Sequence, residues 1–62
     1  MTSIYEIQGV SYLNGGDYLG TSPSLEEAKV WAKAKARLFP EYQVIQVVDV
    51  AATIRAKYKT KG

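Results

Sequence analysis

Hydrophobic and polar residues follow a strand-like pattern at both ends of the chain and a helical pattern between them. Residues 4–13 are rich in β-branched and aromatic side chains, which predicts a strand. Gly9 interrupts this strand and predicts either a bulge or a close backbone approach. The segment Asn14-Gly15-Gly16-Asp17 suits the positive φ angles of a hairpin turn. Residues 18–21 are therefore expected to return antiparallel to the first strand.

Residues 24–39 carry the signals of a single helix. Ser24 and Glu27 have the spacing of a capping box, and Pro40 ends the pattern because it cannot continue a helix. At about 100° per residue, five apolar side chains fall on one stripe that is expected to pack on the sheet. These are Leu25, Ala28, Ala32, Ala36 and Phe39.

Residues 42–50 are dense in valine on both faces, which favours a central strand. Residues 51–62 fit two structures, because their alternation suits an exposed strand and Asp49 could instead cap a short helix. The chain is thus predicted to be one α+β domain over 1–62 with a flexible end. A hairpin, one helix and one or two further strands would form a two-layer sandwich, with the order ββαβ, ββαββ, or ββαβ followed by a short C-terminal helix.

Composition argues against catalysis and against a cofactor. The chain has no cysteine and no histidine, which removes thiolate metal sites and the usual general base. Glu26 and Glu27 point about 100° apart on a helix and suit its first turn electrostatically. No apolar run approaches the roughly 20 residues of a membrane span, and no signal peptide is recognisable. We therefore expect a cytoplasmic protein that is not an enzyme and binds no membrane.

Charge is divided unevenly along the chain. Residues 1–28 hold four acidic and no basic residues, whereas residues 29–62 hold eight basic and two acidic ones. Such a division favours a polyanionic or polar partner, provided that the cations gather on one face. A nucleic-acid-binding domain would use Lys29, Lys33, Arg37, Arg55, Lys57, Tyr58 and Lys59.

One helix can cover only one face of the predicted sheet. The other face must meet water, a second copy or a partner, and an uncovered apolar face usually marks an interaction site. Binding of another protein is accordingly the first hypothesis, nucleic-acid binding the second and closure of the open face in a homodimer the third. The protein-binding candidates are Val10, Tyr12, Asn14, Asp17, Tyr18, Val44 and Val48.

The order of these segments also resembles small phage-encoded inhibitor proteins. The matching pieces are Ser-Leu-Glu-Glu-Ala at 24–28, which opens the helix, and Tyr-Gln-Val-Ile-Gln-Val at 42–47. The host RNA polymerase inhibitor of T-odd phages and some anti-CRISPR proteins are similar in order and size. The resemblance implies an inhibitor of a host protein machine, acting in the host cytoplasm. Its charge departs from the polymerase inhibitor, which is acidic on its working surface, so no contact residue is transferred.

Overall fold

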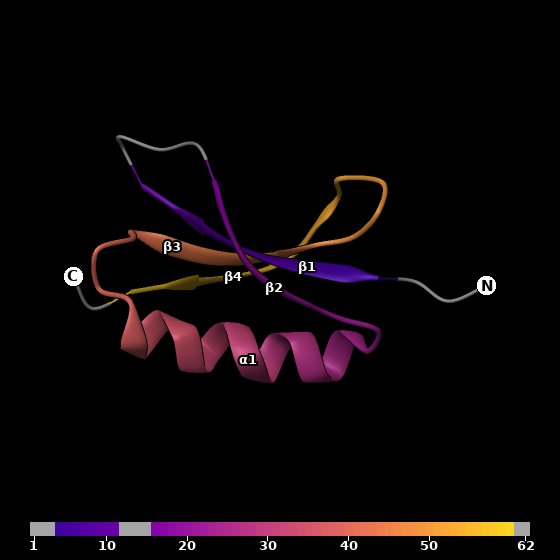
Figure 1. Cartoon of the computed structure of the whole chain (residues 1–62), viewed down its shortest axis with the longest axis horizontal. Helices are drawn as coiled ribbons and strands as arrows, with labels where there is room; N and C mark the ends of the chain where they lie inside the picture. The colour runs from indigo at the N-terminus through magenta and orange to yellow at the C-terminus, as the bar shows by residue number, and fades with distance from the viewer. Residues whose placement is uncertain (1–3, 12–15, 61–62) are drawn as a thin grey trace.

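A computed structural model describes residues 4–11 and 16–60. Strands β1 (Tyr5–Val10) and β2 (Asp17–Ser22) precede helix α1 (Leu25–Leu38), and β3 (Val44–Val48) and β4 (Ile54–Lys59) follow it. The strands form one antiparallel sheet in the order β2-β1-β3-β4, and α1 lies along one side of it (Figure 1). The predicted two-layer α+β fold is confirmed in its ββαββ form, and Ile54–Lys59, within the segment that the sequence left open, is a strand.

The position of β3 explains its composition. It pairs with β1 on one side and β4 on the other, so its backbone lies in the interior of the sheet. Since β1 lies between β2 and β3 and is antiparallel to both, the latter two run parallel, and α1 connects them across β1. Valine suits a strand enclosed in this way, as predicted.

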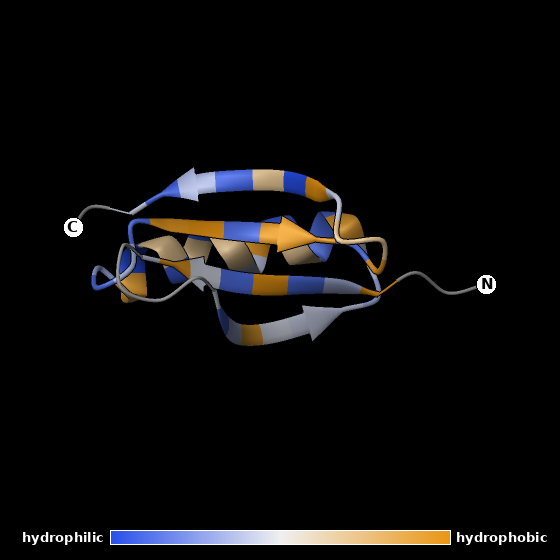
Figure 2. Cartoon of the chain, turned by 90° about the horizontal axis from the view of Figure 1, so that it is seen from above, coloured by the Kyte–Doolittle hydropathy of each residue, from blue (hydrophilic) through white to orange (hydrophobic). Residues whose placement is uncertain are grey.

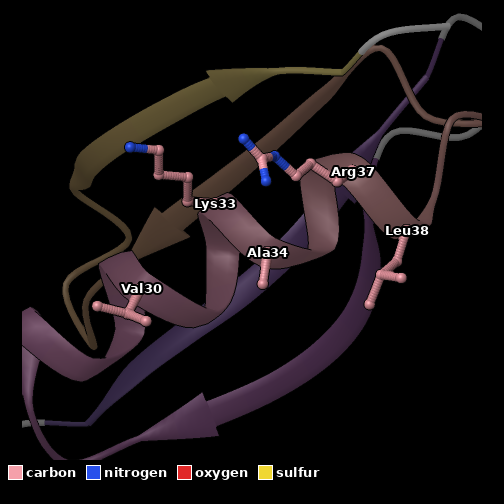
Figure 3. A pocket seen from close by; sticks show the side chains of 5 residues that line it. All are labelled: Val30, Lys33, Ala34, Arg37 and Leu38. Atoms are coloured by element: carbon pink, nitrogen blue, oxygen red, sulfur yellow. The ribbon is translucent and has the colours of Figure 1, made fainter.

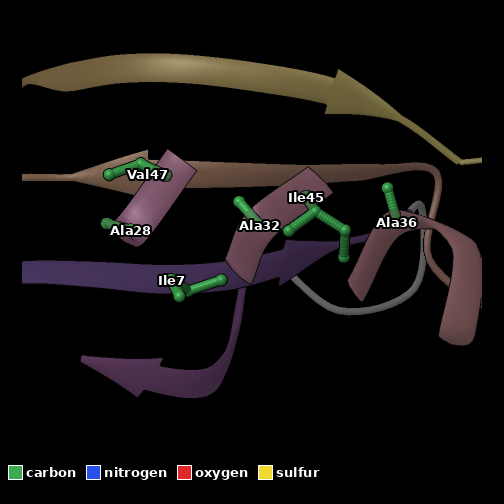
Figure 4. Packing of buried hydrophobic residues seen from close by; sticks show 6 residues of the cluster. All are labelled: Ile7, Ala28, Ala32, Ala36, Ile45 and Val47. Atoms are coloured by element: carbon green, nitrogen blue, oxygen red, sulfur yellow. The ribbon is translucent and has the colours of Figure 1, made fainter. Parts of the chain in front are cut away.

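Small helix residues and branched strand residues make the core. Ala28 and Ala32 are completely buried in α1, and Ile45 and Val47 are completely buried in β3. Ala36 and Ile7 complete the cluster (Figure 4). Alanine lets the helix backbone approach the sheet closely, so few bulky side chains are needed to fill the space. The predicted helix stripe is thus the buried one.

The start of α1 differs in part from the predicted capping box. Ser24 is the N-cap, and its Oγ accepts from the Glu27 amide at 3.3 Å. The Ser24 amide does not turn to Glu27 but donates to Ser22 Oγ at 3.2 Å. Ser22 is only 2% exposed. A buried hydroxyl at the end of β2 thus replaces the carboxylate as acceptor, which leaves Glu27 exposed to solvent.

The hairpin places its bulge in β2. Ile7 pairs with Gly20 and Gln8 pairs with Tyr18, so Leu19 is the extra residue. Gly9 instead meets the ring of Tyr42, where a Cβ atom would lie 2.7 Å from the ring Cγ. Of the two possibilities raised by Gly9, close approach is therefore confirmed. Of the predicted turn, Asn14 and Gly15 lie outside the described residues, as does the chain end, 61–62.

Candidate functional site

The face of the sheet away from α1 carries a polar ladder. Gln46 Nε2 donates to Gln8 Oε1 at 2.8 Å, and Gln8 Nε2 donates to Glu6 Oε1 at 2.8 Å. Lys57 of β4 is in register with Gln46, and Tyr18 of β2 is in register with Gln8. Figure 2 views this open face, with the helix behind the four strands. The middle of this face therefore consists of hydrogen-bonded polar side chains rather than the apolar surface expected from the sequence.

The protein-binding candidates are divided between burial, internal contacts and exposure. Val10 and Val44 pair on the open face and are half-buried, whereas Val48 is 6% exposed. Asp17 accepts a hydrogen bond from Tyr42, and Tyr18 is 64% exposed. Tyr12 and Asn14 are outside the described residues. Among the candidates that can be placed, Tyr18 therefore offers the largest exposed side chain.

Four of the predicted basic residues line a hollow at one edge of the molecule. Lys33 and Arg37 extend from α1 toward β4 (Figure 3), which is an edge strand. Lys57 and Lys59 from β4 line a hollow of about 320 Å³ together with these two side chains. Its remaining walls are Tyr58 and Ala36. We call Lys33, Arg37, Lys57, Tyr58 and Lys59 the basic edge.

The basic edge arises from the regular spacing of residues along helix α1 and along strand β4. Lys33 and Arg37 are four residues apart, about 6 Å along the helix axis. Lys57 and Lys59 are two residues apart on one strand face, about 6.7 Å. Tyr58 alternates with these lysines, so its ring turns under the helix and packs against the core. The two lysines start from the other face of β4, in register with Gln46 and Val44, and border the hollow at the edge of the sheet. Ala36 is the one wall residue that sequence reasoning did not propose, since its place on the apolar stripe of the helix marked it as core.

Two of the predicted cations lie elsewhere or are already paired. Lys29 is half-buried one turn before Lys33 and does not line the hollow. Arg55 contacts Asp49 through Nε at 2.9 Å and Nη2 at 2.5 Å. Within residues 4–11 and 16–60 this is the only ion pair. The four cations of the basic edge thus have no carboxylate partner in the described part of the chain.

Asp49 organises the turn between β3 and β4. Its Oδ1 accepts from the amides of Ala51 and Thr53, each at 3.0 Å, while Oδ2 accepts from Arg55. These donors, led by the Thr53 amide, hold the pKa of Asp49 below its usual 3.8, against the opposing effect of burial. The turn also places Ala52 at φ 61°, in the left-handed region. Asp49 and Arg55 therefore fix the entry to β4.

Tyr42 closes the opposite end of the sheet. Its ring lies on Gly9, and its hydroxyl donates to Asp17 Oδ2 at 2.8 Å. This hydrogen bond, followed by desolvation and the charges of Asp17 and Glu41, raises the pKa of Tyr42 above 10.0. Asp17, proposed from sequence as a partner contact, is thus engaged inside the domain.

No protein-family model, curated protein or solved structure matches the chain. Over the described ranges, no three histidine, cysteine, aspartate or glutamate side chains gather in a manner that could hold a metal ion. No helix in the described part of the chain is long and apolar enough to cross a membrane. The basic edge is therefore interpreted from its own geometry.

Proposed function

We propose that this protein is a non-enzymatic binding module that contacts the phosphate backbone of nucleic acid through the basic edge. The observation that carries the proposal is the convergence of Lys33, Arg37, Lys57 and Lys59 from two elements onto one hollow. Unpaired cations that share a surface can each neutralise a phosphate and release its counterion. This term is independent of sequence, so the expected binding is nonspecific.

Geometry supports backbone contact more than base recognition. Along each element the backbone positions of the two cations are about 6–7 Å apart, a spacing close to that of neighbouring phosphates along a strand. Tyr58 is half-buried beneath the helix and packs against the core, so its ring cannot serve as an open stacking platform. The hollow thus presents charge and little base-reading chemistry.

A salt titration tests the proposal. Binding of a short fluorescent DNA duplex is followed by anisotropy at a series of salt concentrations. Four neutralised phosphates predict a slope of about −3.6 in a plot of log K against log salt. Between about 50 and about 200 mM salt, a fourfold change, the affinity should fall about 150-fold.

A matched pair of variants locates the contact. Lys33→Gln should reduce the slope by about 1. Lys35→Gln removes the same charge from the opposite flank of α1, where the Lys35 chain lies beside Gly20 of β2, and should leave the slope unchanged. Equal effects of the two variants, or absence of binding in dilute buffer, would contradict the proposal. The lysines of β4 would then serve only to keep an edge strand from pairing with other chains.

Protein binding at the open face is the second candidate. It is favoured by the exposure of Tyr18 and by the absence of any described element over that face. Inhibition of a host protein machine, as the phage resemblance implies, belongs to this candidate and remains a prediction. A Tyr18→Ala variant that loses a captured partner, while Lys33→Gln retains it, would favour this candidate over the first.

A further inference from the structure

Helix α1 buries three alanines against the sheet and exposes three of its larger apolar residues. Ala28 and Ala32 face the sheet, whereas the exposed fractions of Val30, Trp31 and Leu38 are 68%, 52% and 70%. Ala34 is exposed between them, and Figure 3 shows Val30, Ala34 and Leu38 along the side of the helix away from the core. We call Val30, Trp31, Ala34 and Leu38 the outer helix surface. Lys33 and Arg37 border the hollow over Val30, Ala34 and Leu38, and an exposed apolar surface of this kind marks an interaction site.

The charges along α1 indicate which partner fits the outer helix surface. The first turn carries Glu26 and Glu27, and the last turn carries Lys35 and Arg37. In an antiparallel pair of identical helices, the acidic turn of each copy therefore lies beside the basic turn of the other. A parallel pair would bring like charges together at both ends. The outer helix surface is thus complementary to itself in one orientation only.

We propose that two copies of this chain associate through the outer helix surface, with their α1 helices antiparallel about a two-fold axis. An offset that sets Val30 opposite Ala34 of the second copy also sets Glu27 opposite Arg37. The two-fold axis repeats both contacts, as an isologous interface requires. Alanine at position 34 lets the helix axes approach closely. Such a pair uses a surface other than the open sheet face and does not rest on nucleic-acid binding.

The area of the outer helix surface sets the expected affinity of the dimer. One helix face buries less than the roughly 800 Å² per partner of a standard interface, so the dimer should be weak and reversible. Sedimentation of the full chain without nucleic acid, at concentrations from about 10 μM to about 1 mM, detects a dimer with a Kd in that range. Trp31 is the only tryptophan, so its emission should shift to shorter wavelength as the dimer forms. A strict monomer throughout this range would overturn the inference.

Matched variants distinguish the helix from the sheet. Ala34→Glu places a carboxylate on the outer helix surface and should raise the dimer Kd at least tenfold. Thr21→Glu adds the same charge on the open face, where Thr21 is in register with Glu6, and should leave the Kd unchanged. Circular dichroism of each variant controls for folding, because both positions are exposed. The reverse result would assign the interface to the sheet and refute the helix pair.

A charge exchange tests the orientation. Glu27→Lys or Arg37→Glu alone should weaken the dimer, since each places like charges opposite one another. The double variant Glu27→Lys/Arg37→Glu restores opposite charges across the two-fold axis and should recover the original Kd. Failure of the double variant to recover would overturn the antiparallel arrangement. Because Arg37 also belongs to the basic edge, the dimer is measured without DNA.

Discussion

The contact between Gly9 and the Tyr42 ring gives a prediction whose sign depends on the ring. In Gly9→Ala, the new methyl carbon would lie 2.7 Å from Cγ and 2.8 Å from both Cδ atoms. Carbon atoms prefer a separation of about 3.5–4.0 Å, so the ring must move by about 1 Å. That movement breaks the 2.8 Å hydrogen bond from Tyr42 to Asp17.

The cost of this substitution can be estimated from its parts. Overpacking costs about 1–3 kcal/mol, and a lost hydrogen bond costs about 1 kcal/mol. Replacing glycine within a strand returns about 0.5–1 kcal/mol, because the unfolded chain loses freedom. We expect Gly9→Ala to lower the free energy of unfolding by about 2 kcal/mol. A domain of this length loses about 4–8 °C in Tm per kcal/mol.

A double-mutant cycle separates the ring contact from backbone effects. Urea denaturation is followed by circular dichroism for the wild type, Gly9→Ala, Tyr42→Ala and the double variant. Once the ring is absent, Gly9→Ala should stabilise the protein by about 0.5–1 kcal/mol. The coupling energy is therefore about 2–3 kcal/mol. An equal loss of stability in both backgrounds would refute the role assigned to Tyr42.

Further predictions concern the turn, the cap and the tyrosine. The lowered pKa of Asp49 contributes stability above pH 3.8 that is lost as pH falls through the folded value, so acid titration should destabilise wild type more than Asp49→Asn. The raised pKa of Tyr42 contributes stability below pH 10.0 that is lost as pH rises through the folded value, and Tyr42→Phe should remove this alkaline loss. Ala52→Gly should stabilise the fold by about 0.5–1 kcal/mol in urea denaturation, because glycine relieves the left-handed conformation, and a loss would contradict this. Ser24→Ala should lower Tm through the loss of about 1 kcal/mol, whereas Ser24→Gly should cost only a few tenths.

The elements with strong local signals could be predicted from the sequence. Ser24 and Pro40 delimit α1 closely, and valine on both faces of β3 correctly indicates a central strand. Strand β4 could not be decided, because Ile54, Ala56 and Tyr58 alternate as in an exposed strand. Val50, Ile54 and Tyr58 are equally spaced as on one side of a helix. Tertiary contacts decide the structure of this segment. Strand β3 offers an open edge, and Asp49 forms a turn that brings Arg55 back along that edge.

The candidate site depended more strongly on facts outside the sequence. Helical spacing placed Lys33 and Arg37 on one flank, but only the strand order shows that this flank faces β4. The exposure of Trp31 and Leu38 was likewise hidden, because their angle on the helix does not reveal how far the sheet extends beneath them. In the sequence, Gln8 and Gln46 are isolated polar residues. Only the register of β1 and β3 shows that they lie side by side.

Chemical-shift mapping tests the central claim most directly. Isotope-labelled protein is titrated with a short DNA duplex in dilute buffer, and amide shifts are followed residue by residue. The account predicts the earliest and largest changes at Ala36, Tyr58 and Lys59, which line one hollow, with little change at Tyr18. Changes confined to β2 and the open face, or no changes at all, would contradict it.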